Sequence, residues 1–196
     1  MIAQLTGKFL HKTPTRVVVD VQGVGYDVQI SLHTYSAIQA ADSGTLFTHL
    51  KVAEDAFTLF GFSEGAEREV FLKLISVSGV GAATARMMLS SMKPAEVVAA
   101  ITGGQVKTLE AVKGIGKKTA ERLVLELKDK MGAVTQDAGA SPAWAAAGSN
   151  NSLQQDALEA LVALGIARSA AEQALRRAGS GATSVQDLIK QALQAI

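Results

Sequence analysis

The stretch Leu109-Glu-Ala-Val-Lys-Gly-Ile-Gly-Lys-Lys-Thr-Ala-Glu-Arg-Leu-Val-Leu-Glu-Leu127 holds two helical patterns separated by the short turn Gly114-Ile115-Gly116. Glycine at the first and third positions allows tight backbone angles and lets another molecule approach the backbone. The second helix is predicted to begin at about Lys117, and its first N–H groups have no partner within the helix. Those donors and the positive end of the helix dipole suit a phosphate oxygen. Four basic side chains add charge around the turn: Lys113, Lys117, Lys118 and Arg122.

Two other phosphate-binding motifs fail on spacing. A P-loop would need glycine where Ala111 stands and a hydroxyl residue where Lys118 stands. A dinucleotide-binding fingerprint would need glycine or alanine at Thr119 and a preceding strand rather than a helix. The remaining interpretation is a helix-hairpin-helix, which clamps a nucleic-acid backbone without reading sequence. The alternative for a lone Gly-x-Gly is a helix C-cap in an ordinary bundle.

The motif occurs twice, which favours the nucleic-acid interpretation. Residues 74–89 align with the stretch that begins at Leu109 at an offset of 35 residues. Two hairpins side by side can hold two phosphates across one groove, as a duplex ligand requires. The candidate backbone-binding residues are Gly79, Val80 and Gly81 in the first hairpin and Gly114, Ile115, Gly116, Lys117, Lys118, Thr119 and Arg122 in the second.

Composition narrows the class of protein. The chain has 196 residues, which is long enough for more than one domain, and its hydrophobic content of 48% supplies a core. No apolar run is long enough to cross a membrane, and the N-terminus lacks the pattern of a signal peptide. The absence of cysteine excludes disulfides and thiolate chemistry. We therefore expect a cytoplasmic protein with no membrane partner.

The net charge of +1 is unevenly distributed. Residues 1–63 carry 4 basic and 5 acidic side chains, and residues 133–196 also carry 4 and 5, so each segment has a charge of −1. Residues 64–132 carry 11 basic and 8 acidic side chains, a charge of +3. The excess positive charge lies in the hairpin region, in agreement with a local phosphate-binding face.

Residues 1–63 are predicted to form an OB-type β-barrel. Five short, β-branched segments alternate with glycine-containing turns, and residues 31–41 can hold a helical turn between the third and fourth strands. The predicted strands are Ile2–Phe9, Arg16–Val21, Tyr26–Leu32, Thr45–Lys51 and Phe57–Phe62. Between the last two lies the acidic pair Glu54-Asp55. Such a pair is ordinarily a solvated turn, but carboxylates held near DNA could also repel phosphates and separate strands at a branch point.

The rest of the chain is predicted to be helical. Residues 64–132 form the tandem helix-hairpin-helix domain, with Ser63 as the N-cap of its first helix. Residues 133–151 are rich in Ala, Gly, Ser and Asn and form a flexible linker. Residues 152–196 form a small three-helix domain with three capping boxes, and its Leu164-Gly165-Ile166 turn resembles the loop of ubiquitin-associated (UBA) domains. The boxes are Ser152-x-x-Gln155, Ser169-x-x-Glu172 and Thr183-x-x-Gln186. Partner-binding candidates are the apolar Leu161, Leu164, Ile166 and Leu193, although these can equally pack the three helices together.

The order of barrel, paired hairpins, linker and three-helix domain resembles the RuvA family of bacterial Holliday junction branch-migration subunits over essentially the whole chain. The segments most similar to the family are Gly23-Val-Gly-Tyr-Asp-Val28, Glu54-Asp55-Ala56 before Leu59-Phe-Gly-Phe62, and Gly114-Ile-Gly-Lys-Lys-Thr-Ala-Glu-Arg122.

The resemblance implies a homotetramer on four-way junction DNA, with one or two tetramers per junction, the hexameric ATPase motor RuvB as partner and the resolvase RuvC as a further partner. It also implies that Glu54 and Asp55 form an acidic pin at the crossover. The chain departs from the family in one motif, because Ala82-Ala83 stands where Pro-Lys is usual. The first hairpin must then bind through its backbone amides.

Two other function classes stay open from the residues alone. Helix-hairpin-helix pairs occur in glycosylases, nucleases and ligases, but catalysis would need a nucleophile with a base or a carboxylate cluster for metal. The sequence offers no such constellation, and His11, His33 and His49 lack ligand spacing. We therefore predict no catalytic residues, no cofactor and no metal. The second alternative is a duplex-binding module without preference for junctions.

Overall fold

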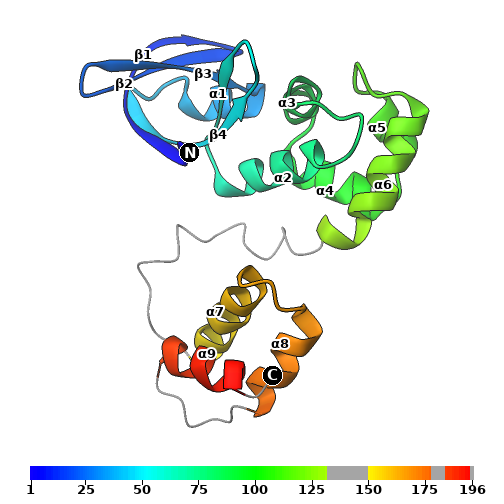
Figure 1. Cartoon of the computed structure of the whole chain (residues 1–196). Coiled ribbons are helices and arrows are strands. Elements are labelled where there is room, and N and C mark those ends of the chain that lie inside the picture. The colour runs from blue at the N-terminus through cyan, green and yellow to red at the C-terminus, as the bar shows by residue number, and fades with distance from the viewer. Residues whose placement is uncertain (132–149, 178–183, 195–196) are drawn as a thin grey trace. The chain divides into compact units, whose positions relative to one another are not determined.

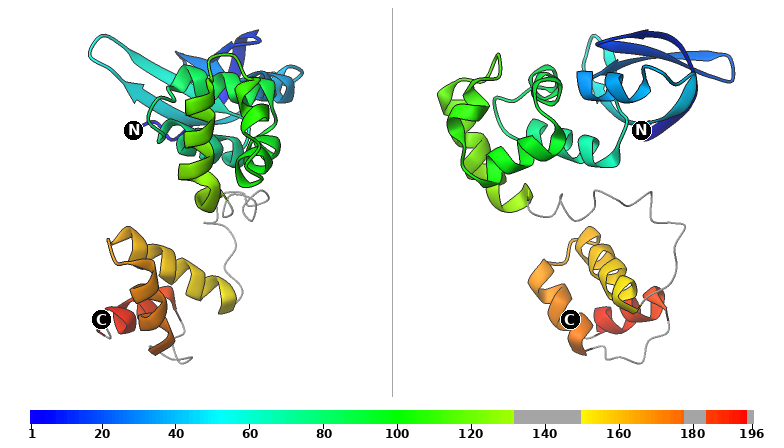
Figure 2. Two further views of the ribbon diagram at one scale, coloured as in Figure 1. Left: turned by 90° about the vertical axis from the view of Figure 1, so that its right-hand side faces the viewer. Right: turned by 180° about the vertical axis from the view of Figure 1, so that it is seen from behind.

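The computed structural model describes residues 1–131, 150–177 and 184–194, and the chain divides into two compact units, Met1–Ser141 and Pro142–Ile196. Figures 1 and 2 show the ribbon of both units. The first holds the barrel and the hairpins, and the second holds three helices. The predicted linker, apart from its last two residues, lies outside the described residues.

The N-terminal strands form a closed barrel in the order β1-β2-β3-β5-β4, with β4 pairing back onto β1. All neighbours are antiparallel except β3 and β5, which run parallel. A short helix, α1, connects β3 to β4, as the sequence predicts. This confirms the OB-type barrel. The elements are β1 (Gln4–Thr13), β2 (Arg16–Val21), β3 (Val24–Ile30), α1 (Leu32–Ile38), β4 (Ser43–Val52) and β5 (Phe57–Phe62).

Strand β1 is longer than the sequence predicts and serves two neighbours. Its first half pairs with β4 and its second half with β2. A register shift between Phe9 and His11 interrupts the alternation of apolar and polar residues. Because of this interruption, the sequence pattern does not predict the second part of the strand. Gly7 lies near the change of partner, where an added Cβ would stand 2.1 Å from the carbonyl oxygen of Asp20. Only glycine fits this close approach.

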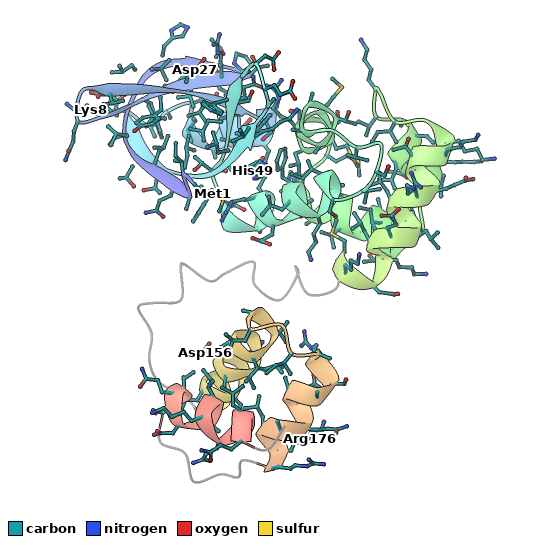
Figure 3. All side chains as sticks on the ribbon, in the orientation of Figure 1. Met1, Lys8, Asp27, His49, Asp156 and Arg176 are labelled. Carbon is teal, nitrogen blue, oxygen red and sulfur yellow. The ribbon has the colours of Figure 1, made fainter. Side chains whose placement is uncertain are left out.

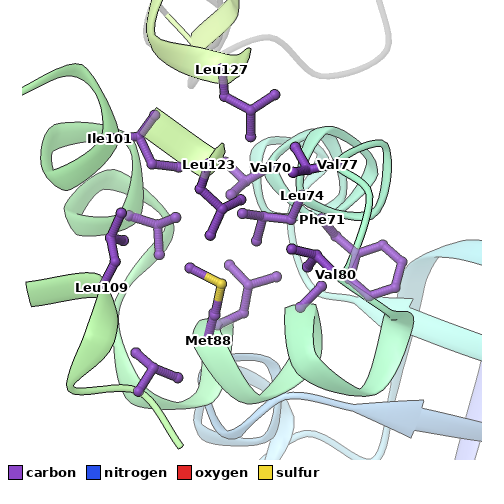
Figure 4. Packing of buried hydrophobic residues seen from close by; sticks show 14 of the residues in the cluster. Val70, Phe71, Leu74, Val77, Val80, Met88, Ile101, Leu109, Leu123 and Leu127 are labelled. Carbon is purple, nitrogen blue, oxygen red and sulfur yellow. The ribbon is translucent and has the colours of Figure 1, made fainter. Parts of the chain in front are cut away.

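The helical domain follows the predicted order. Its helices are α2 (Gly65–Ile75), α3 (Ala82–Ser91), α4 (Pro94–Thr102), α5 (Val106–Glu110) and α6 (Lys117–Met131). The prediction that Ser63 caps α2 is wrong: the N-cap position is Glu64, which makes no side-chain cap bond. The Ser63 backbone N–H instead donates to Thr34 Oγ1 at 3.1 Å. Figure 4 shows the buried side chains of these helices converging on Met88 and Leu123.

The barrel has its own interior core, and two of its phenylalanines join the separate core of the helical domain. Phe60 and Phe62 of β5 pack on Phe71 of α2, with ring centroids 5.2 and 4.9 Å apart. His49 of β4 lies against the same ring at 5.6 Å, on the side of the barrel that faces the helices (Figure 3). Burial, followed by the charge of Arg68, lowers the pKa of His49. Both effects favour the neutral imidazole, which packs as part of an aromatic cluster.

The described residues of the C-terminal unit form three helices, as predicted: α7 (Asn150–Ala163), α8 (Arg168–Arg177) and α9 (Val185–Gln194). Its small core is built largely from alanine and leucine. The core residues are Ala157, Leu161, Ala171, Ala174, Leu175, Leu188 and Ala192.

Two of the three predicted capping boxes of this unit do not begin at a helix N-cap. Ser152 and Ser169 lie inside α7 and α8, and Glu172 pairs with Arg168 at 3.2 Å instead of reaching back to a cap. Thr183 lies outside the described residues. Helix α9 is capped by Ser184, whose hydroxyl accepts from the Asp187 N–H at 3.2 Å. A Ser or Thr three residues before Glu or Gln thus marks the vicinity of a helix start, but not its first residue.

Replacing Gly7 with alanine is expected to destabilise the barrel, because the new methyl group would overlap a backbone carbonyl that cannot move without breaking the β1–β2 ladder. We expect the free energy of unfolding to fall by about 2 kcal/mol or more, as for other overpacked sites. Urea denaturation followed by circular dichroism measures this. Gly65→Ala is the matched control, since nothing lies within 4 Å of an added Cβ there. Equal stability of both variants would contradict the close approach at Gly7.

Candidate nucleic-acid interface

The two predicted hairpins have the same backbone structure. The first joins α2 to α3 and the second joins α5 to α6. In each turn one N–H donates three residues back, from Val80 to Val77 O at 3.0 Å and from Ile115 to Val112 O at 3.1 Å. The first helical bond also repeats, with Gly81 O accepting from Ala85 and Gly116 O from Ala120. The sequence repeat is therefore a structural repeat.

Glycine at the start of each turn is required by the backbone. Gly79 has φ +91° and Gly114 has φ +92°, in the left-handed region that other residues avoid. The middle residues point inward, since Val80 and Ile115 are each only 5% exposed. Of these two predicted contact residues, only the backbone is available to a ligand. The buried side chains anchor the turn and hold its amides at the surface.

Glycine at the end of each turn is not required by the protein interior. An added Cβ at Gly81 or Gly116 would meet no atom within 4 Å, and neither residue has a left-handed φ. Both residues are exposed. The missing side chain leaves open space directly before the first turns of α3 and α6. The first three N–H groups of each helix precede its first internal bond and are free for an external acceptor.

Positive charge is concentrated at the second hairpin. Lys117 and Lys118 are exposed at the start of α6, and Lys117 lies 4.0 Å from Glu121, at the limit of an ion pair. At the equivalent positions the first hairpin has Ala82, which is buried, and Ala83, which is exposed. The two turns therefore offer the same amide geometry, with cationic side chains at the second alone.

Arg122 has a role that the sequence does not reveal. Its guanidinium pairs with Glu126 at 3.1 Å and donates to the carbonyl oxygen of Ser78, in the first hairpin, at 3.4 Å. The side chain thus bridges from the second hairpin's helix to the first hairpin's turn. Its charge is shared with these two acceptors, so it is less available to a ligand than Lys117 or Lys118. The bridge joins residues 44 positions apart, and no local pattern indicates it.

The acidic pair lies at the tip of the β4–β5 hairpin. The Ala53 N–H donates to Ala56 O at 2.9 Å and closes the turn, which leaves Glu54 and Asp55 exposed at its end. Within the described residues, neither carboxylate has a hydrogen-bond or ion-pair partner. Phe57, the residue that pairs with Val52 at the base of the turn, is also exposed. The tip therefore presents uncompensated negative charge on the barrel.

The predicted partner-binding residues of the C-terminal unit separate into two kinds. Leu161 is fully buried in the three-helix core, and Ile166 packs against that core. Leu164 is 65% exposed and Leu193 is 47% exposed. Only the last two present substantial apolar surface to a partner.

The family models match the whole architecture. A model described as the RuvA N-terminal domain matches residues 1–61, and one described as a SAM-like helix-hairpin-helix tandem matches residues 71–129. A model described as the RuvA C-terminal domain matches residues 152–196. The chain belongs to the RuvA family.

Relatives in this family are similar over nearly the full length. The chain is 47% identical to a Holliday junction branch migration complex subunit RuvA of Cytophaga hutchinsonii, with 99% of both chains covered. A protein of the same name from Christiangramia forsetii is 44% identical with the same coverage. One from Laribacter hongkongensis is 43% identical, with 100% of this chain and 98% of the relative covered.

The described ranges hold neither a metal-binding cluster nor a membrane-spanning helix. There, no group of three or more His, Asp or Glu side chains is placed to hold a metal ion. No helix within residues 1–131, 150–177 or 184–194 is long and apolar enough to cross a membrane.

We expect Gly116→Ala to weaken DNA binding without weakening the fold. The methyl group would occupy the space in front of the α6 amides, and losing even one charge-assisted hydrogen bond costs about tenfold in affinity. Fluorescence anisotropy with labelled DNA measures the affinity, and urea denaturation measures stability. Gly114→Ala is the contrasting variant, since its left-handed φ predicts lower stability. Wild-type affinity in a folded Gly116→Ala protein would contradict backbone binding at this turn.

Proposed function

We propose that this chain binds four-way DNA junctions as a homotetramer and brings a hexameric ATPase motor, RuvB, to them for branch migration. The observation that carries the proposal is the pair of equivalent turns, each with an open glycine edge before free helix N-terminal amides. Phosphate contacts of this kind position a protein on DNA without reading its sequence. Membership of the RuvA family supports junction DNA as the ligand.

We propose that this chain binds the DNA and that the motor RuvB hydrolyses ATP. The backbone-binding groups are the residues of the two hairpin turns with Lys117, Lys118 and Thr119, while Arg122 acts mainly between the hairpins. RuvC is a further proposed partner, and we place the complex in the bacterial cytoplasm, where the DNA lies. Titration of a four-way junction and of a linear duplex of equal length, across a salt series, tests the proposal. Equal affinity for both would favour the general duplex-binding alternative.

The acidic tip is proposed to select the junction over linear duplex. Glu54 and Asp55 have no positive partner among the described residues, so phosphates of an uninterrupted duplex would meet repulsion there. At a four-way crossover the strands diverge, and the carboxylates can enter the space between them. The exposed position of the tip on a rigid β-hairpin suits this role.

We predict that Glu54→Gln with Asp55→Asn raises affinity for linear duplex and leaves junction affinity nearly unchanged. The double variant keeps size and removes charge, so its melting temperature should match that of the unchanged chain. Competition of unlabelled duplex against labelled junction measures the ratio of junction affinity to duplex affinity. Asp42→Asn is the matched control, because Asp42 is an exposed barrel carboxylate away from the tip. Full discrimination by the double variant would rule out the pin for this chain.

The C-terminal unit is proposed to contact the motor through Leu164 and Leu193. Both leucines lie outside the three-helix core and offer exposed apolar side chains to a partner. Because this unit is compact by itself, it can bind a partner independently of the DNA-binding unit.

We predict that Leu164→Asp leaves junction binding intact and reduces stimulation of ATP-driven branch migration by about tenfold or more, the effect of a buried hot-spot residue. Gln173→Asp, an exposed position on α8, is the control. Circular dichroism checks that both variants fold. Normal branch migration with Leu164→Asp would exclude this leucine from the motor contact.

A further inference from the structure

Three polar side chains are buried together where the barrel meets the helical domain. Ser31 and Thr34 belong to the start of α1, and Glu67 belongs to the first turn of α2. Within the described residues, the buried polar and charged side chains are these three and Thr48. Glu67 is fully buried. A buried carboxylate is costly unless it is paired by hydrogen bonds.

In this cluster, each hydroxyl accepts one hydrogen bond and donates another. Ser31 Oγ accepts from the Thr34 N–H at 3.0 Å and donates to one Glu67 oxygen. Thr34 Oγ1 accepts from the Ser63 N–H at 3.1 Å and donates to the other oxygen at 2.6 Å. Each hydroxyl thus links a backbone N–H to the carboxylate. Glu67 receives two donors from the barrel's helix.

The surroundings of the carboxylate explain how it is tolerated. Burial raises the pKa of Glu67, while the Ser31 and Thr34 hydroxyls, the charge of His33 and the Ser63 backbone lower it. The carboxylate also lies at the N-terminal turns of both α1 and α2, where helix dipoles favour negative charge. His33 faces the same region with a buried Nε2 that has no hydrogen-bond partner in the described part of the chain.

Apolar side chains in place of Glu67 and its partners would avoid the free-energy cost of burying a charge. The shared Phe60–Phe71 packing already holds the two domains together, but apolar attraction has no direction. Hydrogen bonds from α1 to Glu67 add direction and fix the angle between the barrel and α2. The acidic tip belongs to the barrel and the hairpins belong to the helices, so this angle sets the distance between them.

We propose that Glu67 is a positioning residue for junction recognition: its bonds to Ser31 and Thr34 hold the acidic tip at a fixed place relative to the phosphate-binding hairpins. The effect on junction recognition rests on the proposed function. The geometric part, that these bonds fix the angle between the barrel and α2, does not depend on it. Arg86 and Ser90 of α3 assist at the same boundary. Arg86 donates to Thr15 O at 3.0 Å, and Ser90 Oγ accepts from the Leu32 N–H at 3.1 Å.

The test compares Thr34→Val, which removes one hydroxyl at constant shape, with Thr34→Ser, which keeps it. Glu67→Gln is the second variant, because one of the two acceptor oxygens is replaced by an NH2 group that only donates. The chain has no cysteine, so spin labels can be placed at Gln4→Cys in the barrel and Ala99→Cys in α4. Both positions are exposed. Labelled full-length chain, diluted in unlabelled chain, gives the distance distribution between the barrel and the helical domain by pulsed electron paramagnetic resonance.

We expect a narrow distribution for the unchanged chain and for Thr34→Ser, and a broad one for Thr34→Val and Glu67→Gln. The preference for junction over duplex should fall by no more than about tenfold, the energy of one charge-assisted hydrogen bond, while duplex affinity stays within a factor of about two. Rescue by serine separates positioning from a general loss of packing. A narrow distribution in Thr34→Val, or a broad one with full junction preference, would overturn the proposal. If the unchanged chain shows no junction preference, the proposed function fails, and the distance measurement still decides the geometric part.

Discussion

The structure depends on a backbone constraint that occurs twice. A left-handed glycine, Gly79 or Gly114, reverses the chain within three residues, and the buried Val80 or Ile115 that follows anchors the turn in the core. With the turn anchored from inside, the next helix starts at the surface with its first amides facing solvent. The amide geometry that we propose for phosphate binding is therefore produced by packing, and charged side chains add to it. This explains how a hairpin with Ala82-Ala83 can retain the same amide arrangement as one with two lysines.

The second requirement is that the two hairpins and the acidic tip act as one body. Arg122 connects the hairpins by its bond to Ser78 O, and the Phe60–Phe71 packing connects barrel and helices. Glu67 adds directional bonds across the same boundary. The charged Arg122 thus joins the two hairpins, while aromatic packing and the buried hydrogen bonds of Glu67 join the barrel to the helices. A ligand with several backbone segments in fixed relation, such as a four-way junction, is the kind that this rigidity suits.

The features that the sequence predicts are those encoded locally. The glycines and apolar residues at an offset of 35 predict both hairpins, and alternating β-branched residues predict five strands. The bulge near His11 breaks that alternation, so the end of β1 is missed. Ser184 and Asp187 form a cap that the Ser/Thr-x-x-Glu/Gln pattern does not include. The bridge from Arg122 and the burial of Glu67 could not be predicted, because each depends on contacts between segments more than 30 residues apart.

The central claim is that backbone amides of both hairpins hold the DNA. Amide proton shifts report hydrogen bonding directly, so the most direct measurement is a TROSY NMR titration of the deuterated full-length chain with a four-way junction. We predict large downfield shifts for amides at the starts of both α3 and α6, at residues 81–84 and 116–119, at the same DNA ratio. Shifts confined to the second hairpin, or to lysine-bearing surfaces elsewhere, would contradict a clamp built from two equivalent turns.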